Sequence, residues 1–251
     1  MSGINWKAYF RITRTATYGF LASLPLLLLY EGLILFANGG RAAQVRVGAE
    51  VWMKQLLALV GGTGMLVLSV VVLLVGIGIF LYERKKSIPI RPRYFGWIVG
   101  ESAVYAVAVA IAVSTVVGTI FTFFPVAEPL LFQSGGLMRQ SIQMKIALSI
   151  GAGLYEELLF RVILVGGLFV LMRRLFVRER AAYFAAAVVG ALLFSAVHYI
   201  GALGDTFTLP SFAFRFLFGL MLNGLFLARG FAVAAWTHAL YDIMVVTNFF
   251  G

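Results

Sequence analysis

The sequence contains no cysteine and few charged residues, although it is 251 residues long. Without cysteine, the chain can form no disulfide, no thiolate metal site and no cysteine nucleophile. Only 12% of its residues are charged and 62% are hydrophobic, which excludes an ordinary soluble globular domain. Apolar runs of about 20 residues, the length that crosses a bilayer as a helix, recur along the chain. We therefore predict an all-α, polytopic membrane protein.

Acidic residues are also scarce. The chain has 10 Asp and Glu against 20 Lys and Arg, so its formal net charge is +10. Such a charge can attract nucleic acid. Here, however, the basic residues cluster at the ends of apolar segments, where they set topology and meet anionic lipid headgroups. We therefore expect the lipid bilayer, and no nucleic acid, as a partner.

Seven segments are expected to cross the membrane as a helical bundle, and the sequence shows no repeat and no separate soluble domain. They are residues 18–37, 57–82, 96–124, 143–171, 181–200, 211–228 and 231–249. The first run could be mistaken for a signal peptide. It is too long for one and contains Pro25 and Glu31, so we expect a retained helix. Glu31 either faces the bundle interior or reaches the headgroups.

The basic residues predict the orientation of the chain. With a cytoplasmic N-terminus, the cytoplasmic side holds the basic clusters of residues 7–14, 84–93 and 173–180, and fewer basic residues lie on the other side. Cytoplasmic connections carry an excess of Lys and Arg. We therefore expect a cytoplasmic N-terminus and a C-terminus on the opposite side, in a multi-pass protein of a bacterial or archaeal cell membrane.

Residues 41–55 differ in character from the apolar runs. One helical face would carry charged residues and another apolar residues, namely Arg41, Arg46, Glu50 and Lys54 against Val45, Ala49, Trp52 and Leu56. This pattern is typical of a short amphipathic helix that lies at the membrane interface. A solvated connector is the alternative interpretation.

Two adjacent glutamates and an arginine lie inside the fourth apolar segment. Charges at this depth are costly, and they usually face a protein interior and serve a function. Glu157 and Arg161 are four residues apart and share a helix face, so they can pair. Glu156 lies about 100° further round the helix and stays free to act as a general base. A structural pair that pins two helices is the alternative for Glu157 and Arg161.

Histidine is the other scarce residue, since His198 and His238 are the only two. Phe194 precedes His198 by one helical turn and could support its imidazole. The turn between the fourth and fifth segments is centred near Val177, 21 residues after Glu156 and 21 before His198. An antiparallel helix pair would therefore bring these two side chains to one depth.

His238 and Asp242 lie on one helix face, again four residues apart. Asp242 could orient the imidazole and fix its tautomer. Alternatively, both could donate to an oxyanion, provided that Asp242 is protonated. We predict that the three segments meet in one polar cavity within the membrane.

These residues resemble the three motifs of the CAAX protease and bacteriocin-processing family, which includes the type II CAAX prenyl endopeptidases. The motifs are Glu156-Glu157-x-x-x-Arg161, Phe194-x-x-x-His198 and His238-x-x-x-Asp242. The resemblance covers roughly residues 140–250. It divides the chain into N-terminal membrane helices, residues 1–140, and a catalytic helical core, residues 141–251, within one continuous membrane domain.

The resemblance implies an intramembrane protease. It assigns Glu156 and His198 to water activation and His238, with its partner four residues later, to oxyanion stabilisation. That partner is often asparagine in the prenyl-protease branch, whereas Asp242 cannot donate a hydrogen bond when ionised. We therefore favour an orienting role for Asp242. Glu157, Arg161 and Phe194 would support the site.

Two histidines and two glutamates could also bind zinc, through Glu156, Glu157, His198 and His238. Their spacing is not the His-Glu-x-x-His pattern of zinc proteases, and a metal-free water fits the prenyl-protease branch. We expect no cofactor and keep zinc as the alternative.

The leading hypothesis is an intramembrane endopeptidase that hydrolyses a peptide bond of a membrane-associated protein or peptide. A non-enzymatic scaffold or immunity protein of the same fold is one alternative. A proton-coupled transporter, which also uses buried Glu and His, is another, although no repeat supports it.

Overall fold

The computed structural model describes residues 5–39, 45–59, 64–123, 140–201 and 204–249, and the regular elements of these residues are all helical. The longer helices are α1 (Trp6–Thr13), α2 (Ala16–Ala37), α3 (Gly48–Ala58), α4 (Gly64–Glu83), α5 (Pro92–Phe123), α6 (Ile142–Gly151), α7 (Gly166–Met172), α8 (Glu179–Val197), α9 (Leu209–Arg229) and α10 (Phe231–Val246). A short 3₁₀ turn, Arg84–Lys86, follows α4. The all-α prediction is confirmed.

The fourth predicted segment forms one helical rod from α6 to α7. Two π-helical stretches, Ala152–Glu156 and Leu158–Val165, occupy its middle. Such wide turns are rare and frequently occur at functional sites. The observed rod, residues 142–172, agrees with the predicted limits of 143–171.

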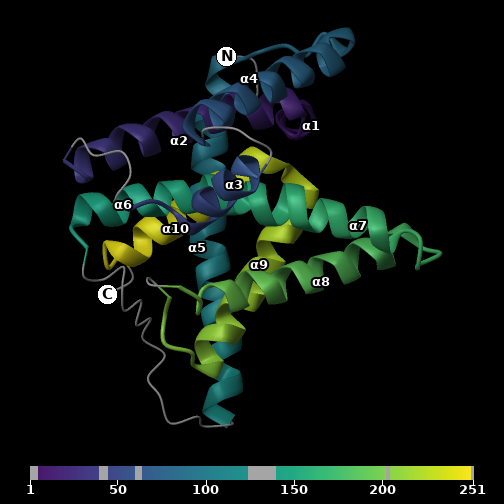
Figure 1. The fold of residues 1–251 in the computed structure, drawn as a ribbon. Coiled ribbons are helices and arrows are strands. Elements are labelled where there is room, and N and C mark those ends of the chain that lie inside the picture. Colours follow the sequence, from purple (N-terminus) through teal and green to yellow (C-terminus); the bar gives the residue numbers. More distant parts are fainter. Residues whose placement is uncertain (1–4, 40–44, 60–63, 124–139, 202–203, 250–251) are drawn as a thin grey trace.

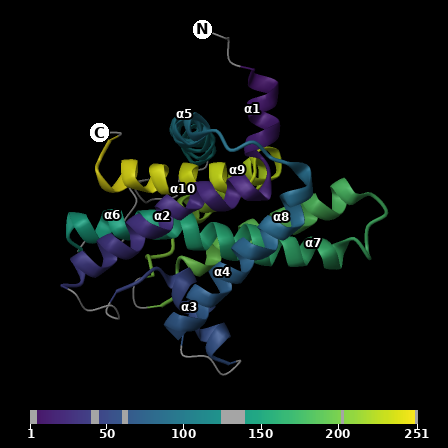
Figure 2. The ribbon, with the colours of Figure 1, turned by 90° about the horizontal axis from the view of Figure 1, so that it is seen from above.

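The rod packs against both α2 and α10, which also contact each other. Figures 1 and 2 show α2, α6 and α10 running side by side, with α5 crossing α10 at a steep angle and appearing end-on from above. One apolar core cluster joins α2, α3, α6 and α10, and a second joins α5, α9 and α10. The residues of α10 from Ala232 to Ala235 are at most 1% exposed. This short helix is therefore the centre of the molecule.

Small side chains let α10 approach the rod closely. A Cβ atom on Gly153 would lie 2.6 Å from the carbonyl oxygen of Ala235 and 2.6 Å from the Cβ of Ala239. Only glycine fits at such a contact between two backbones. The close approach brings the acidic residues of the rod within reach of the histidine on α10.

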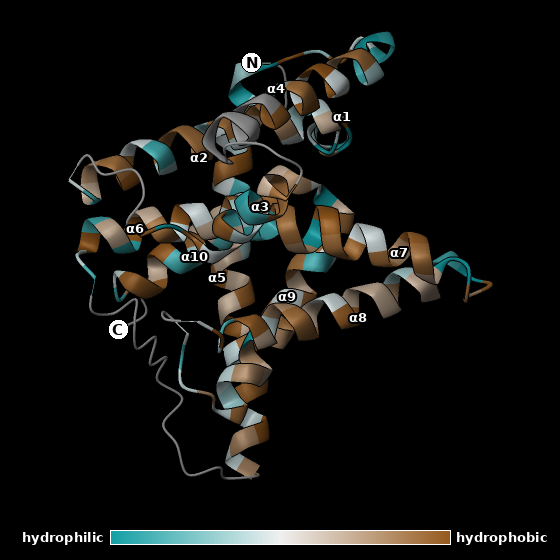
Figure 3. Ribbon diagram, viewed as in Figure 1, coloured by the Kyte–Doolittle hydropathy of each residue, from teal (hydrophilic) through white to brown (hydrophobic). Residues whose placement is uncertain are grey.

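The helices carry an apolar outer surface. Among the described residues, α2, α5, α8 and α9 are long and apolar enough to cross a membrane, and α10 is a shorter apolar helix. Figure 3 shows hydrophobic residues over most of the helices and hydrophilic residues at the α7–α8 turn and after α4. The chain is an integral membrane protein. The count of seven crossings stays a prediction.

The predicted interfacial helix at residues 41–55 corresponds in part to α3, which covers Gly48–Ala58. Residues 41–44 lie outside the described part, and α3 begins only at Gly48. Leu57 and Ala58, predicted to open the second span, end α3 instead, so the helix of that span begins at Gly64.

Helix α3 buries residues from both of its predicted faces, since Ala49 and Glu50 are 3% and 0% exposed. Its charged residue Glu50 is fully buried, whereas Leu56 is 58% exposed. The reason is that partners surround Glu50, which pairs with Arg46 and Lys54 and accepts a hydrogen bond from the hydroxyl of Tyr30. Charged residues of a helix in a membrane protein usually face the protein interior.

Other differences from the sequence prediction are small. Glu31, whose side chain is 35% exposed, forms an ion pair with Arg46 at 2.9 Å. Helix α5 begins at Pro92, four residues before the predicted start, because proline is well suited to the first helical turn. Helix α1 was not predicted.

Candidate active site

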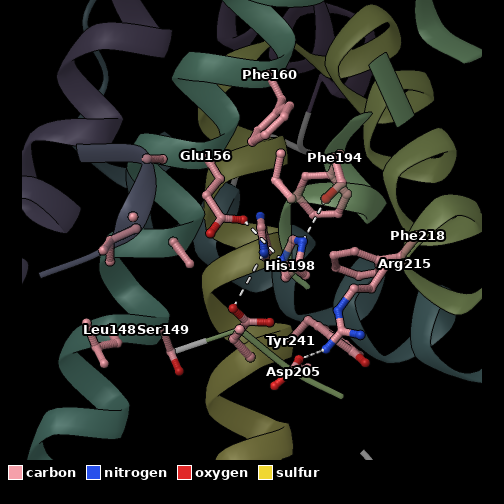
Figure 4. A pocket seen from close by; sticks show the side chains of 18 of the residues that line it. Leu148, Ser149, Glu156, Phe160, Phe194, His198, Asp205, Arg215, Phe218 and Tyr241 are labelled. Carbon is pink, nitrogen blue, oxygen red and sulfur yellow. Dashed lines mark hydrogen bonds and ion pairs between the residues drawn. The ribbon is translucent and has the colours of Figure 1, made fainter. Parts of the chain in front are cut away.

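A cavity of about 280 Å³ lies among α3, the rod, α8, α9 and α10. Its polar lining residues are Arg46, Ser149, Glu156, His198, Asp205, Arg215, His238 and Asp242. Aromatic side chains, including Phe160, Phe214 and Phe218, form much of the remaining wall. Figure 4 shows Glu156 and His198 facing each other across it. The three predicted segments thus meet in one cavity, with Glu156, His198, His238 and Asp242 on its wall.

Glu156 and His198 form the first pair of the site. The Oε2 atom of Glu156 lies 3.8 Å from the Nε2 atom of His198, and their side chains are 17% and 25% exposed. This contact confirms the prediction that the two reach one depth in an antiparallel helix pair. Figure 1 shows the long hairpin of α7 and α8 that produces this register.

His198 is not inside its helix but caps the C-terminal end of α8. Its Nδ1 lies 2.7 Å from the carbonyl oxygen of Phe194, and the two rings are 4.8 Å apart between centroids. A carbonyl can only accept, so Nδ1 carries the proton. The lone pair on Nε2 therefore points toward Glu156. The predicted contact between Phe194 and His198 is present.

Glu157 and Arg161 form a buried ion pair behind the cavity. The Nε–Oε2 distance is 3.0 Å, and the two side chains are 0% and 1% exposed. The guanidinium also lies 4.5 Å from the centroid of the Phe194 ring, a cation–π contact. The predicted pairing is therefore present, and Glu156 is the glutamate that faces the cavity.

His238 connects this ion pair to the cavity. Its Nδ1 lies 2.7 Å from Oε1 of Glu157, and its Nε2 lies 3.5 Å from Oδ2 of Asp242. A carboxylate thus faces each nitrogen of the ring. The contact with Asp242 was expected from the spacing of four. The shorter contact with Glu157 was not, because it depends on how α10 lies against the rod.

Sequence reasoning missed four further polar wall residues, namely Arg46, Ser149, Asp205 and Arg215. Arg46 comes from the turn before α3, and Arg215 lies on α9 and pairs with Asp205. Neither arginine belongs to a motif with the histidines or glutamates. A basic residue inside an apolar run, as Arg215 is, was the one available signal.

The residues proposed for a zinc site do not converge on one point. Glu157 is held by Arg161 and by Nδ1 of His238, whereas Glu156 faces Nε2 of His198. Among the described residues, no three His, Asp or Glu side chains are placed to hold one metal ion. The donor set of this geometry therefore does not fit a zinc ion, and no step below uses one.

A comparison with protein-family models identifies the family that the C-terminal part of the chain resembles. Residues 138–244 match the family model described as type II CAAX prenyl endopeptidase Rce1-like. A search of curated proteins and a search of solved structures each found no significant match. The matched range contains the rod, α8, α9 and nearly all of α10, which carry the two histidines and the Glu156-Glu157 pair.

Proposed function

The chain belongs, through residues 138–244, to the Rce1-like family of type II CAAX prenyl endopeptidases, and on this premise we propose that it is an intramembrane endopeptidase. Its substrate is a membrane-associated protein or peptide whose scissile bond enters the cavity. The single observation that carries the proposal is the placement of Glu156 opposite His198 on the cavity wall.

This placement suits the activation of one water molecule. A water that bridges the two groups at about 2.8 Å from each can give one hydrogen to Oε2 of Glu156 and the other to Nε2 of His198. Both hydrogens are then directed away from the substrate, and an oxygen lone pair is left for attack. Glu156 takes the proton as the water adds to the peptide carbonyl carbon, and the same proton goes on to the leaving nitrogen.

His238 is suited to stabilise the oxyanion of the tetrahedral intermediate. With Glu157 near Nδ1 and Asp242 near Nε2, the imidazole satisfies both carboxylates only when it carries two protons. The positive charge of such an imidazolium favours the negative charge that develops on the carbonyl oxygen. Asp242 then orients His238 and does not itself donate.

The buried pair has a supporting role in this scheme. Arg161 pairs with Glu157, and Glu157 holds Nδ1 of His238. The ring orientation of His238 is thereby fixed from the side opposite the cavity.

The test is substitution of Glu156 by glutamine, which keeps the shape and removes the base. Cells that express the wild type or Glu156→Gln are compared by mass spectrometry of membrane-protein termini. Cells with the wild type should contain new protein termini that the protease produces. In cells with Glu156→Gln these termini should form about 10² to 10⁴-fold more slowly, which is the usual effect of losing a general base.

Glu179→Gln is the matched control, because Glu179 is exposed and pairs with Arg173 far from the cavity. It should cleave like the wild type. Identical termini from Glu156→Gln and the wild type would refute the proposal and favour a scaffold or a transporter.

A further inference from the structure

The segment that carries His198 leaves its helix at this residue. After the cap of α8 the chain turns through Gly201, whose φ is +94°, and reaches Asp205 before α9 begins at Leu209. The imidazole must keep its Nε2 toward Glu156 although it stands at the start of this connection. The N–H of His198 still donates to the carbonyl oxygen of Ser195 at 3.3 Å, and contacts outside the helix add to this hold.

The guanidinium of Arg215 contacts residues on both sides of this connection. Arg215, on the second turn of α9, forms an ion pair with Asp205, donates a hydrogen bond to the hydroxyl of Ser211, and donates another to the hydroxyl of Tyr199 at 2.9 Å. Tyr199 in turn donates to Ser211 at 2.8 Å. Tyr199 is the residue directly after His198.

A second contact, a backbone hydrogen bond from Asp205, also reaches His198. The backbone N–H of Asp205 donates to the carbonyl oxygen of His198 at 2.9 Å. Arg215 thus holds both residues that fix His198 through the chain, its neighbour Tyr199 and its hydrogen-bond partner Asp205. Figure 4 shows Arg215 and Asp205 joined beside His198 at the cavity.

The burial of this arrangement makes it rigid. The side chains of Arg215 and Asp205 are 12% and 11% exposed, so water competes little for their charges. A planar guanidinium donates in fixed directions, which a lysine cannot reproduce. The contacts therefore fix Tyr199 and Asp205 relative to α9.

We infer that Arg215 is a positioning residue for His198, which it holds through Tyr199 and Asp205 so that Nε2 faces Glu156. The inference rests on the proposed function insofar as His198 acts on water. It does not require Arg215 to touch the substrate.

The first test needs no proteolysis. Because the chain has only two histidines, histidine-selective ¹⁵N labelling yields two imidazoles, which His198→Ala assigns. In the wild type, His198 should be protonated on Nδ1 alone. In Arg215→Met this signal should broaden and shift toward a mixture of tautomers, while the signal of His238 stays in place.

Two variants separate positioning from a general loss of stability. Arg229→Met removes another buried arginine, which pairs with Glu101 at 2.6 Å remote from His198, and it should leave both signals unchanged. Arg215→Met should still fold, because Ser195 independently ties α8 to the backbone of Phe212 at 2.8 Å. The exchange Asp205→Arg with Arg215→Asp should restore part of the wild-type signal.

The second test measures kinetics once a cleaved peptide is known. Arg215→Met and Arg215→Lys should lower kcat by about 10 to 100-fold with little change in KM, as expected for a misplaced reacting group. Unchanged histidine signals in Arg215→Met would overturn the inference. Changed signals with no cleavage by any form of the protein would overturn the proposed function and leave the positioning intact.

Discussion

At the scale of single residues, four side chains of the rod and α10 form a continuous series of contacts. The series leads from Arg161 through Glu157 and His238 to Asp242. Each member is held by its neighbour, at 3.0, 2.7 and 3.5 Å in turn. Removal of one partner from such a buried arrangement leaves an uncompensated charge, whereas removal of both partners often costs much less. The stability of the site should therefore depend on pairs more than on individual residues.

Arg161→Met should accordingly destabilise the protein by about 3–5 kcal/mol, because Glu157 loses its arginine inside an apolar bundle. Thermal unfolding of the detergent-solubilised protein, followed by tryptophan fluorescence, measures this as a lower midpoint. The double variant Glu157→Leu with Arg161→Met should recover a part of the loss.

Arg173→Met is the control for the removal of a charge. Arg173 and Glu179 are 54% and 70% exposed, so the loss of this pair should cost less than about 1 kcal/mol. A midpoint of Arg161→Met equal to that of Arg173→Met would show that the buried pair adds nothing to stability.

The residue contacts that could be predicted are those set by helical spacing. A separation of four residues suffices to expect Glu157 with Arg161 and His238 with Asp242. The contact of Glu157 with His238 joins residues 81 apart in the sequence, and its geometry follows from the packing of α10 against the rod. The same holds for Arg46, which reaches the cavity from the N-terminal helices.

At the scale of helices, the contact between the rod and α10 determines the site. The two elements approach closely at Gly153, where an added Cβ would meet the backbone of Ala235 and Ala239. Both elements are helices, so the backbone of neither can shift away from an added Cβ without also moving residues on the adjacent turns. Glu157 lies one turn beyond Gly153 on the rod, and His238 precedes Ala239 on α10.

Gly153→Ala should therefore separate the two helices. Overpacking of this kind costs about 1–3 kcal/mol. It should also lower cleavage by about 10 to 100-fold, because it displaces His238 from Glu157 and from the cavity. The unfolding midpoint and the rate of cleavage are measured on the same preparation.

Gly100→Ala is the matched substitution in α5, where an added Cβ meets nothing within 4 Å. Alanine there should be neutral or should stabilise the helix by up to about 1 kcal/mol. A Gly153→Ala protein that behaves like Gly100→Ala would show that the helices tolerate a wider separation.

The positions of the helices in the sequence were largely predictable, whereas the face that each helix buries was not. Long apolar runs locate α2, α5, α8 and α9 to within a few residues, because bilayer thickness fixes their length. For α3 a helix was predictable, but the burial of its residues was not. Leu56 is exposed, and the burial of Glu50 depends on Arg46, Lys54 and Tyr30, whose placement no local pattern reveals.

At the scale of the whole molecule, the basic connections gather at one end. Figures 1 and 2 place the α7–α8 turn and the end of α4 on one side, and the end of α2, the start of α6 and the end of α10 on the other. The rod from Ile142 to Met172 joins the two sides. At a rise of 1.5 Å per residue it spans about 46 Å, more than the hydrocarbon core of a bilayer.

The predicted orientation places the side of residues 84–93 and 173–180 in the cytoplasm, and it stays a prediction. Because the chain has no cysteine, a single introduced cysteine reports its position without background. Lys85→Cys and Arg178→Cys should react with a membrane-impermeant maleimide only in inside-out vesicles. Gln140→Cys, two residues before α6, should react only in intact cells. Labelling of Gln140→Cys and Arg178→Cys from one side would mean that the rod does not cross the membrane, and the site between them would then open toward a single face.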